Sequence, residues 1–233
     1  MIRHVVVYAA LLALLVGGFA FFQSSVFRLR TIEIQGIEHL SAEEVKMILG
    51  VEGGQHLYSF TIGDLHHRLM SDPRVAEASL QRNLPGQLVV EILEKPPVAV
   101  VISGGVFAQV DERGTVISVH ERWPEVDLPV IKPISPDSLA LGEKVSGDSD
   151  VDKLLRCSVL LNEVRSEISE IKLSDGYFEM YTSDAAVILY PREAEAMREA
   201  ASVLKEILRE ENIGGYLVDL RVPGRPVLRQ LDD

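Results

Sequence analysis

The sequence predicts an α+β protein, in which an N-terminal transmembrane helix precedes a β-α-α-β-β domain and a β-rich domain with two helices. Residues 5–22 form one apolar run without a charge. Residues 27–95 alternate strand-like and helix-like patterns, and residues 98–233 contain many short strand-like runs. We therefore expect a cytoplasmic tail at residues 1–4, a membrane helix at 5–22, and domains at 27–95 and 98–233.

The composition restricts the class of protein. The 233 residues are 47% apolar and 25% charged, which is typical of a folded globular chain. The formal net charge of −12 argues against nucleic acid as the main partner, because phosphate binding needs a basic surface. One cysteine, Cys157, excludes an intrachain disulfide and a cysteine-based zinc site.

The N-terminal run is predicted to span a membrane. Its length is at the lower end of the ~17–25 residues that a helix needs to cross the hydrocarbon core. We assign Val5, Leu11, Leu15 and Phe22 to the spanning segment. The alternative is a signal peptide cleaved near the small residues Gly18 and Ala20. Both alternatives place the rest of the chain outside the cytoplasm.

The next segment predicts two short helices between strands. Residues 27–35 predict a strand that Gly36 ends. Ser41 and Glu44 have the spacing of a capping box, and Gly50 predicts the end of that helix. A second helix has an apolar stripe of Ile62, Leu65 and Leu69, and Asp72-Pro73 ends it. Strands at 75–82 and 87–94 form a hairpin across the Pro-Gly turn at 85–86.

The second domain is predicted to be mostly β-structure. We expect strands at 98–102, 106–110, 116–119, 168–173, 177–181, 186–190, 216–222 and 227–231, with proline-interrupted or loop segments at 128–131 and 135–149. One helix begins at Asp150, with an apolar stripe of Leu154, Cys157, Leu161, Val164 and Ile168. A longer helix runs from about 192 to 210 and ends near Asn212; its stripe is Ala194, Met197, Ala201, Leu204 and Leu208.

No catalytic, metal or cofactor site is predicted. Asp64 and His67 could share one face of a helix, whereas His66 and His67 diverge. Two ligands of uncertain facing do not make a zinc site, which normally takes three or four, so we expect a solvated surface. His39, His56 and His120 are isolated in the sequence. Cys157 lies on an apolar stripe, which predicts a buried, inert thiol. The sequence contains neither a phosphate-binding glycine loop nor a nucleophile elbow, so we expect a binding protein and not an enzyme.

The final strands are the candidate binding surface. A terminal edge strand leaves backbone groups unpaired, and a partner strand can add to them. Residues 222–229 form this candidate edge, with Val227 and Leu228 available for contacts. The alternative is that Pro223 and Pro226 only protect an ordinary edge from unwanted pairing.

Several motifs, in this order, resemble those of a known family. They are Asp-Pro-Arg-Val at 72–75, Arg-Asn-Leu-Pro at 82–85, Glu-Lys-Pro-Pro-Val-Ala at 94–99, Val-Asp-Glu-Arg-Gly at 110–114, Leu-Pro at 128–129 and Val-Asp-Leu-Arg at 218–221. With the single membrane helix, they resemble the bacterial cell-division family FtsQ/DivIB, and the first domain resembles its POTRA domain. The second half is then an FtsQ-type β-domain.

The resemblance implies a non-enzymatic scaffold of the division machinery. It implies an inner-membrane protein of type II topology, periplasmic and enriched at the division site, which links early and late division proteins in septum formation. Its β-domain would bind the FtsB–FtsL complex, and its POTRA domain would dock other division proteins. The alternative is a POTRA-containing chaperone of envelope protein export or assembly.

The family's contact residues transfer to individual positions of this chain. The resemblance implies partner contacts at Arg192, at Arg221 and along the strand that follows it, which here includes Val222, Val227 and Leu228. Guanidinium groups suit bidentate pairing with partner carboxylates. Many members of the family carry an aromatic residue where this chain has Val222, so a large anchor is missing at that position.

Overall fold

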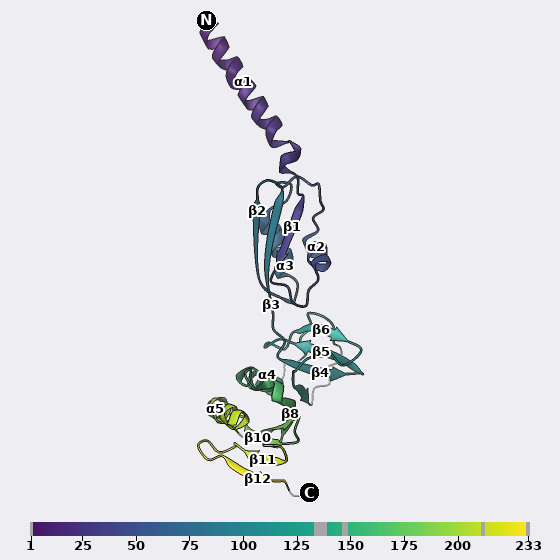
Figure 1. Cartoon of the computed structure of the whole chain (residues 1–233), viewed down its shortest axis with the longest axis vertical. Coiled ribbons are helices and arrows are strands. Elements are labelled where there is room, and N and C mark those ends of the chain that lie inside the picture. Colours follow the sequence, from purple (N-terminus) through teal and green to yellow (C-terminus); the bar gives the residue numbers. More distant parts are fainter. Residues whose placement is uncertain (1, 133–138, 146–148, 211–212, 232–233) are drawn as a thin grey trace. The chain divides into compact units, whose positions relative to one another are not determined.

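The computed structural model describes residues 2–132, 139–145, 149–210 and 213–231 (Figure 1). These residues form two compact units, Met1–Glu94 and Lys95–Asp233. The first unit contains α1 Ile2–Phe22, η1 Ser25–Phe27, β1 Thr31–Gln35, α2 Ala42–Leu49, α3 Ile62–Met70, β2 Val75–Asn83 and β3 Gln87–Glu94.

The second unit contains most of the strands. Its elements are β4 Ala99–Ser103, β5 Val106–Val110, β6 Val116–His120, β7 Val130–Lys132, α4 Ser149–Leu160, η2 Arg165–Glu167, β8 Ile168–Ser174, β9 Tyr177–Thr182, β10 Val187–Pro191, α5 Ala194–Glu210, β11 Tyr216–Asp219 and β12 Val227–Gln230. The predicted α+β class is confirmed.

Helix α1 is apolar on every described face. A stretch long enough to cross a membrane runs over Val7–Phe27, and none of it is buried within the protein. Leu11, Leu15 and Phe22 all expose large apolar side chains, and Val5 lies in the same helix. Such side chains need an apolar surrounding, which a bilayer supplies.

The first unit folds around a three-stranded sheet of order β1-β3-β2. Strand β3 is central; it pairs parallel with β1 and antiparallel with β2. The predicted capping box is present, because the Ser41 side chain accepts the Glu44 amide while the Glu44 carboxylate accepts the Ser41 amide. The apolar faces of α2 and α3 join the sheet in one core. The predicted hairpin of β2 and β3 is also present.

The first strand is shorter than predicted. Phe27 lies in η1, and β1 begins only at Thr31. The reason is that the intervening backbone pairs with the 55–57 loop: the Leu29 amide donates to Gln55 O and the Leu57 amide donates to Phe27 O, each at 2.7 Å. The turn at Gly86 fits closely against this segment, since a Cβ at that residue would lie 2.5 Å from the Arg28 carbonyl oxygen.

The second unit contains a nine-stranded sheet of order β12-β11-β10-β9-β8-β7-β4-β5-β6. Helices α4 and α5 lie side by side in Figure 1, and α5 packs on β10 while α4 packs on β8. Their inner faces and the sheet share one core. The segment 128–131 was expected to be interrupted by proline, but its last two residues begin the short strand β7, which is parallel to both β4 and β8. Pro129 lies just before it and accepts the Val100 amide through its carbonyl oxygen.

The two helices differ from the prediction at their ends. The apolar stripe of α4 was expected to continue to Ile168, but the helix ends at Leu160. Leu161, Val164 and Ile168 are still buried in the core, although the backbone that carries them is not helical. Helix α5 begins at Ala194, which is exposed and not part of the buried stripe. Residues 135–138 and 146–148 of the expected loop at 135–149, and the helix end near Asn212, lie outside the described residues.

The last strands are also shorter than predicted. Strand β11 ends at Asp219 and not at residue 222, because the Asp219 carboxylate accepts the Arg221 amide at 3.1 Å and turns the chain. Strand β12 ends at Gln230. These changes place Arg221 and Val222 in the bend that joins the two strands.

Candidate partner-binding surface

Strand β12 forms one edge of the nine-stranded sheet. It pairs antiparallel with β11 on one side, with Val218 opposite Leu228 and Asp219 opposite Val227. The Leu231 amide donates to Gly215 O at 2.8 Å, so the amides of Val227 and Arg229 face β11 by the alternation of the strand. The amides of Leu228 and Gln230 consequently point away from the sheet.

The edge is exposed, and the first half of β12 is apolar. All four residues of β12 are exposed. Val222 is 57% exposed in the bend, and Val227 and Leu228 are 43% and 39% exposed in the strand. Leu228 lies opposite the buried Val218 and so faces the helix side, whereas Val227 lies on the other face. A partner strand could therefore form a ladder here and reach apolar side chains on both faces.

Arg221 is oriented by two groups, the Asp219 carboxylate and the Tyr177 ring. Its Nε and Nη2 donate to the two carboxylate oxygens of Asp219 at 2.9 and 2.6 Å. Its guanidinium lies over the Tyr177 ring, 5.0 Å from the centroid. The hydrogen bonds from Arg221 hold the pKa of Asp219 below its ordinary value, and the same contact raises the pKa of Arg221. About half of the Arg221 side chain is still exposed, so it can reach a partner carboxylate.

Arg192 is held differently. It lies between β10 and α5, is less exposed than Arg221, and forms an ion pair with Asp150 at the start of α4. Its Nε is buried and has no hydrogen-bond partner among the described residues. This arginine connects the two helices locally, and a partner would have to compete with or extend the contact to Asp150.

The sheet topology places the two arginines at the same end of neighbouring strands. Strands β10 and β11 are parallel, with Leu189 beside Asp219, and the Leu220 amide donates to Leu189 O. The chain leaves β10 towards Arg192 and leaves β11 towards Arg221 at that same end. Tyr177 lies there too, because it pairs with Pro191. Tyr177 was not expected at this surface, because its only signal in the sequence is an aromatic residue at the start of a strand.

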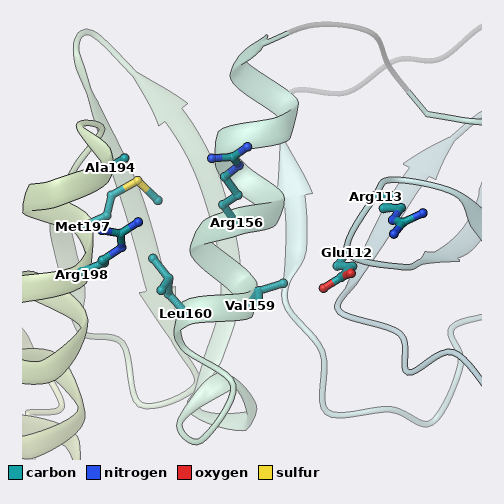
Figure 2. A pocket seen from close by; sticks show the side chains of 8 residues that line it. All are labelled: Glu112, Arg113, Arg156, Val159, Leu160, Ala194, Met197 and Arg198. Carbon is teal, nitrogen blue, oxygen red and sulfur yellow. The ribbon is translucent and has the colours of Figure 1, made fainter.

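A second surface feature is a hollow of about 320 Å³ beside α4 and α5. Figure 2 shows Leu160 and Met197 between the two helices, and Glu112 with Arg113 on the turn after β5. Arg156 and Arg198 also line it, together with Val159 and Ala194. Its lining combines aliphatic side chains with arginines, which suits contact with a protein surface better than acid–base chemistry.

The residues that the sequence offered for a metal site or for nucleophilic catalysis are either exposed on a helix surface or buried and unreactive. Asp64, His66 and His67 are all exposed on α3. Within the described ranges, no group of three histidine, cysteine, aspartate or glutamate residues could hold a metal ion. Cys157 is fully buried, and desolvation raises the pKa of its thiol far above the ordinary value. That thiol stays protonated and is a poor nucleophile.

Comparison with known proteins agrees with this architecture. Residues 27–95 match the family described as "POTRA domain, FtsQ-type". The chain is 24% identical to the cell division protein FtsQ of Geotalea daltonii over 218 residues, which cover 89% of this chain and 78% of the relative. It is 30% identical to FtsQ of Anaeromyxobacter sp. over 70% of this chain and 56% of the relative. It is 25% identical to the cell division protein DivIB of Staphylococcus aureus over 71% of this chain and 36% of the relative.

The matched part thus spans most of one relative, about half of the second and about a third of the third. The matches extend well beyond the first unit, and that unit has the strand and helix order of the matched domain. The chain therefore belongs to the FtsQ/DivIB family, and its residues 27–95 form an FtsQ-type POTRA domain.

Proposed function

We propose that this protein is a non-enzymatic scaffold of the bacterial cell-division machinery that captures a partner strand on β12. The FtsQ/DivIB family consists of structural division proteins and is not an enzyme family. The observation that carries the proposal is the exposed edge of β12, flanked by the exposed Val222 and the oriented Arg221.

The partner that we propose is the FtsB–FtsL complex. A strand of this complex would add to β12, and its carboxylates would pair with Arg221 and Arg192. Asp219 and Tyr177 hold the Arg221 guanidinium in one orientation, which reduces the side-chain entropy lost on binding. Val222, Val227 and Leu228 would supply the apolar contacts. The POTRA domain would dock further division proteins and so link early and late members of the machinery.

The proposed topology follows from α1. We propose that residues 5–22, including Val5, Leu11, Leu15 and Phe22, span the inner membrane once as a type II anchor. Residues 1–4 would be cytoplasmic, and the POTRA domain at 27–95 and the β-domain at 98–233 would be periplasmic at the division site. Anchoring confines the protein to a surface and raises the effective concentration of its partners, so modest affinities are sufficient.

The backbone part of the proposal is tested by the substitution Leu228→Pro. Proline removes the outward amide of Leu228 but leaves the amides that bond to β11, and edge strands tolerate it in this orientation. Leu228→Ala is the matched variant, because it shortens the side chain and keeps the amide. We expect Leu228→Pro to weaken capture of the FtsB–FtsL complex about ten-fold more than Leu228→Ala, since one ladder hydrogen bond is lost. Equal binding of the two variants would contradict strand addition.

The electrostatic part is tested by Arg221→Glu. The new carboxylate would face Asp219 and repel acidic groups of the partner, so we expect binding to fall well over ten-fold. Arg122→Glu changes the charge equally at another exposed residue of the second unit and should bind normally. Undiminished binding by Arg221→Glu, with the fold intact by circular dichroism, would remove this residue from the interface.

The cellular role is tested separately. Depletion of the protein should give filamentous, undivided cells, and a fluorescent fusion should gather at midcell. A fusion spread evenly around the envelope, with normal septation after depletion, would instead favour an export or assembly chaperone.

A further inference from the structure

A hollow of about 530 Å³ opens beside the last turn of α1 in the first unit. Phe19 and Phe22 of the helix line one part of it. Gln23, Arg28, Gly54 and His56 line the rest. The hollow therefore has an apolar part on the helix and a polar part on the segments that follow it.

His56 fixes the end of α1 against this hollow. Its Nε2 donates to the Phe22 carbonyl oxygen at 2.9 Å, and its Nδ1 accepts the Tyr58 amide at 3.3 Å. The carbonyl can only accept and the amide can only donate, so this geometry requires the neutral ring with the proton on Nε2. Phe22 is the last residue of α1, and the carbonyl groups at the end of a helix have no hydrogen-bond partner within the helix.

An aromatic cluster packs beside the hollow; its members are Phe22, Phe27, His56 and Tyr58. The ring centroid of Phe22 lies 5.4 Å from Phe27, 5.2 Å from His56 and 5.2 Å from Tyr58. Arg82 lies over the Tyr58 ring at 5.2 Å, and its guanidinium donates to the carbonyl oxygens of the same loop. These contacts fix the walls without using Arg28.

Backbone hydrogen bonds join the two polar walls. The Gly54 amide donates to Leu29 O at 2.7 Å, and the Leu29 amide donates back to Gln55 O at 2.7 Å. Arg28 and His56 also form an isolated antiparallel bridge. The position of Arg28 at the hollow is therefore set by the fold of the loop.

The order of the lining residues along the chain matches the layers of a bilayer. The Gln23 amide still donates to Phe19 O, so the backbone remains helical between them. Four residues of helix rise about 6 Å. The headgroup layer on each side of a bilayer is roughly 5–8 Å thick. With Phe22 as the last residue of the proposed span, Phe19 lies inside the edge of the hydrocarbon, and Gln23 and Arg28, which line the same hollow, lie in the headgroup layer.

The charge at this level also points to an anion. Arg28 is exposed, and its guanidinium has no ion pair among the described residues. Arg30 is exposed as well, and among the residues that the structure describes its guanidinium makes only a 3.5 Å contact, to Ser25 O. A phosphate group or its hydration water would satisfy such groups.

We propose that this hollow binds the phosphate of an anionic phospholipid headgroup, with Arg28 as the phosphate ligand and Phe19 and Phe22 against the acyl chain. The inference rests on the proposed membrane anchoring of α1. It assigns to the POTRA domain a fixed contact with the lipid surface, separate from the strand-capture surface on β12.

The test uses the full-length protein in nanodiscs of phosphatidylcholine, with and without roughly 30% phosphatidylglycerol. Hydrogen exchange of the Leu29, Gly54 and Leu57 amides reports on the walls of the hollow. We expect phosphatidylglycerol to slow this exchange about five-fold, the effect of one basic residue at an anionic surface. Arg28→Ala should abolish the slowing, Arg28→Lys should keep part of it, and Lys46→Ala, at an exposed residue of α2, should keep all of it.

Each other result overturns the proposal in an identifiable way. If the protein enters the discs but phosphatidylglycerol does not slow the exchange of these amides, the anionic-lipid site is refuted and the anchor is left intact. Slowing by inorganic phosphate in pure phosphatidylcholine would assign the hollow to a free anion. A protein that fails to enter discs would refute the anchor itself, and the site with it. Binding of the FtsB–FtsL complex is measured independently, so failure of the lipid site does not decide it.

Discussion

Replacement of Arg74 by methionine should destabilise the POTRA domain by about 2–3 kcal/mol. Arg74 joins the end of α3 to the start of α2: its Nε and Nη2 donate to the Asp72 carboxylate at 2.9 Å each, and its Nη1 donates to Glu44 at 2.7 Å. The Asp72 side chain is only 10% exposed, so its loss of a partner accounts for about 2 kcal/mol. Glu44 is far more exposed, and solvent screening limits its share to about 0.5 kcal/mol.

The effect should depend on pH in a defined direction. The side-chain hydrogen bond from Arg74, with those from Ser41, lowers the pKa of Glu44 from 4.5 to about 2. Burial raises the pKa of Asp72, but the hydrogen bonds from Arg74 outweigh it and leave the value below 3.8. A carboxylate whose pKa is lower in the folded state stabilises fully above its unfolded pKa and loses that contribution as pH falls through the folded value. The difference between wild type and variant should therefore shrink as pH falls from about 5 to about 2.

Urea unfolding of the full-length protein in detergent, read by hydrogen exchange of β2 and β3, measures this difference. Lys46→Met is the control, because Lys46 is exposed and has no ion pair among the described residues. A loss under about 0.5 kcal/mol near neutral pH would refute the reasoning. So would a loss that stays the same down to about pH 2.

Two further predictions concern other buried or half-buried groups. The Glu94 carboxylate accepts the amides of Glu38, His39 and Leu40, so Glu94→Gln should lower the melting temperature of the POTRA domain by about 4–8 °C, for a loss of about 1 kcal/mol. Burial raises the pKa of Glu94, but these amides outweigh it, so the wild-type advantage should fade below about pH 4, and an advantage that grows in acid would contradict the assignment. Cys157 should resist iodoacetamide at mildly alkaline pH until denaturant is added, because burial raises the pKa of its thiol; modification of the native protein at the rate of an exposed thiol would show that the α4 core opens.

Local chemistry made part of the fold predictable. The capping box at Ser41 and the glycine after α2 act within one turn of helix, so the sequence alone indicates both ends of that helix. The hairpin of β2 and β3 is similarly encoded by its short turn. Strand β7 could not be predicted in this way, because three residues next to a proline become a strand only through β4 and β8, which lie far away in the sequence.

The candidate surface shows the same limit. The exposed last strand was predictable from the prolines that precede it and from its position as the final strand-like run of the sequence. Strand β11 was expected to be longer. Its end at Asp219 depends on one side-chain hydrogen bond to the Arg221 amide. The contact of Arg221 with Tyr177 joins residues from separate strands, and only the parallel pairing of β10 and β11 brings them to the same end of the sheet.

The parallel pairing of β1 with β3 has a mechanical consequence. The chain enters the POTRA sheet at the start of β1, next to the anchor, and leaves it at the end of β3. Tension between a fixed anchor and a moving partner would pull these two ends in opposite directions along the strands. The load would then shear the whole ladder from Thr31–Gln87 to Gln35–Glu91 at once instead of unzipping it bond by bond. The domain is thus arranged to transmit force without extending.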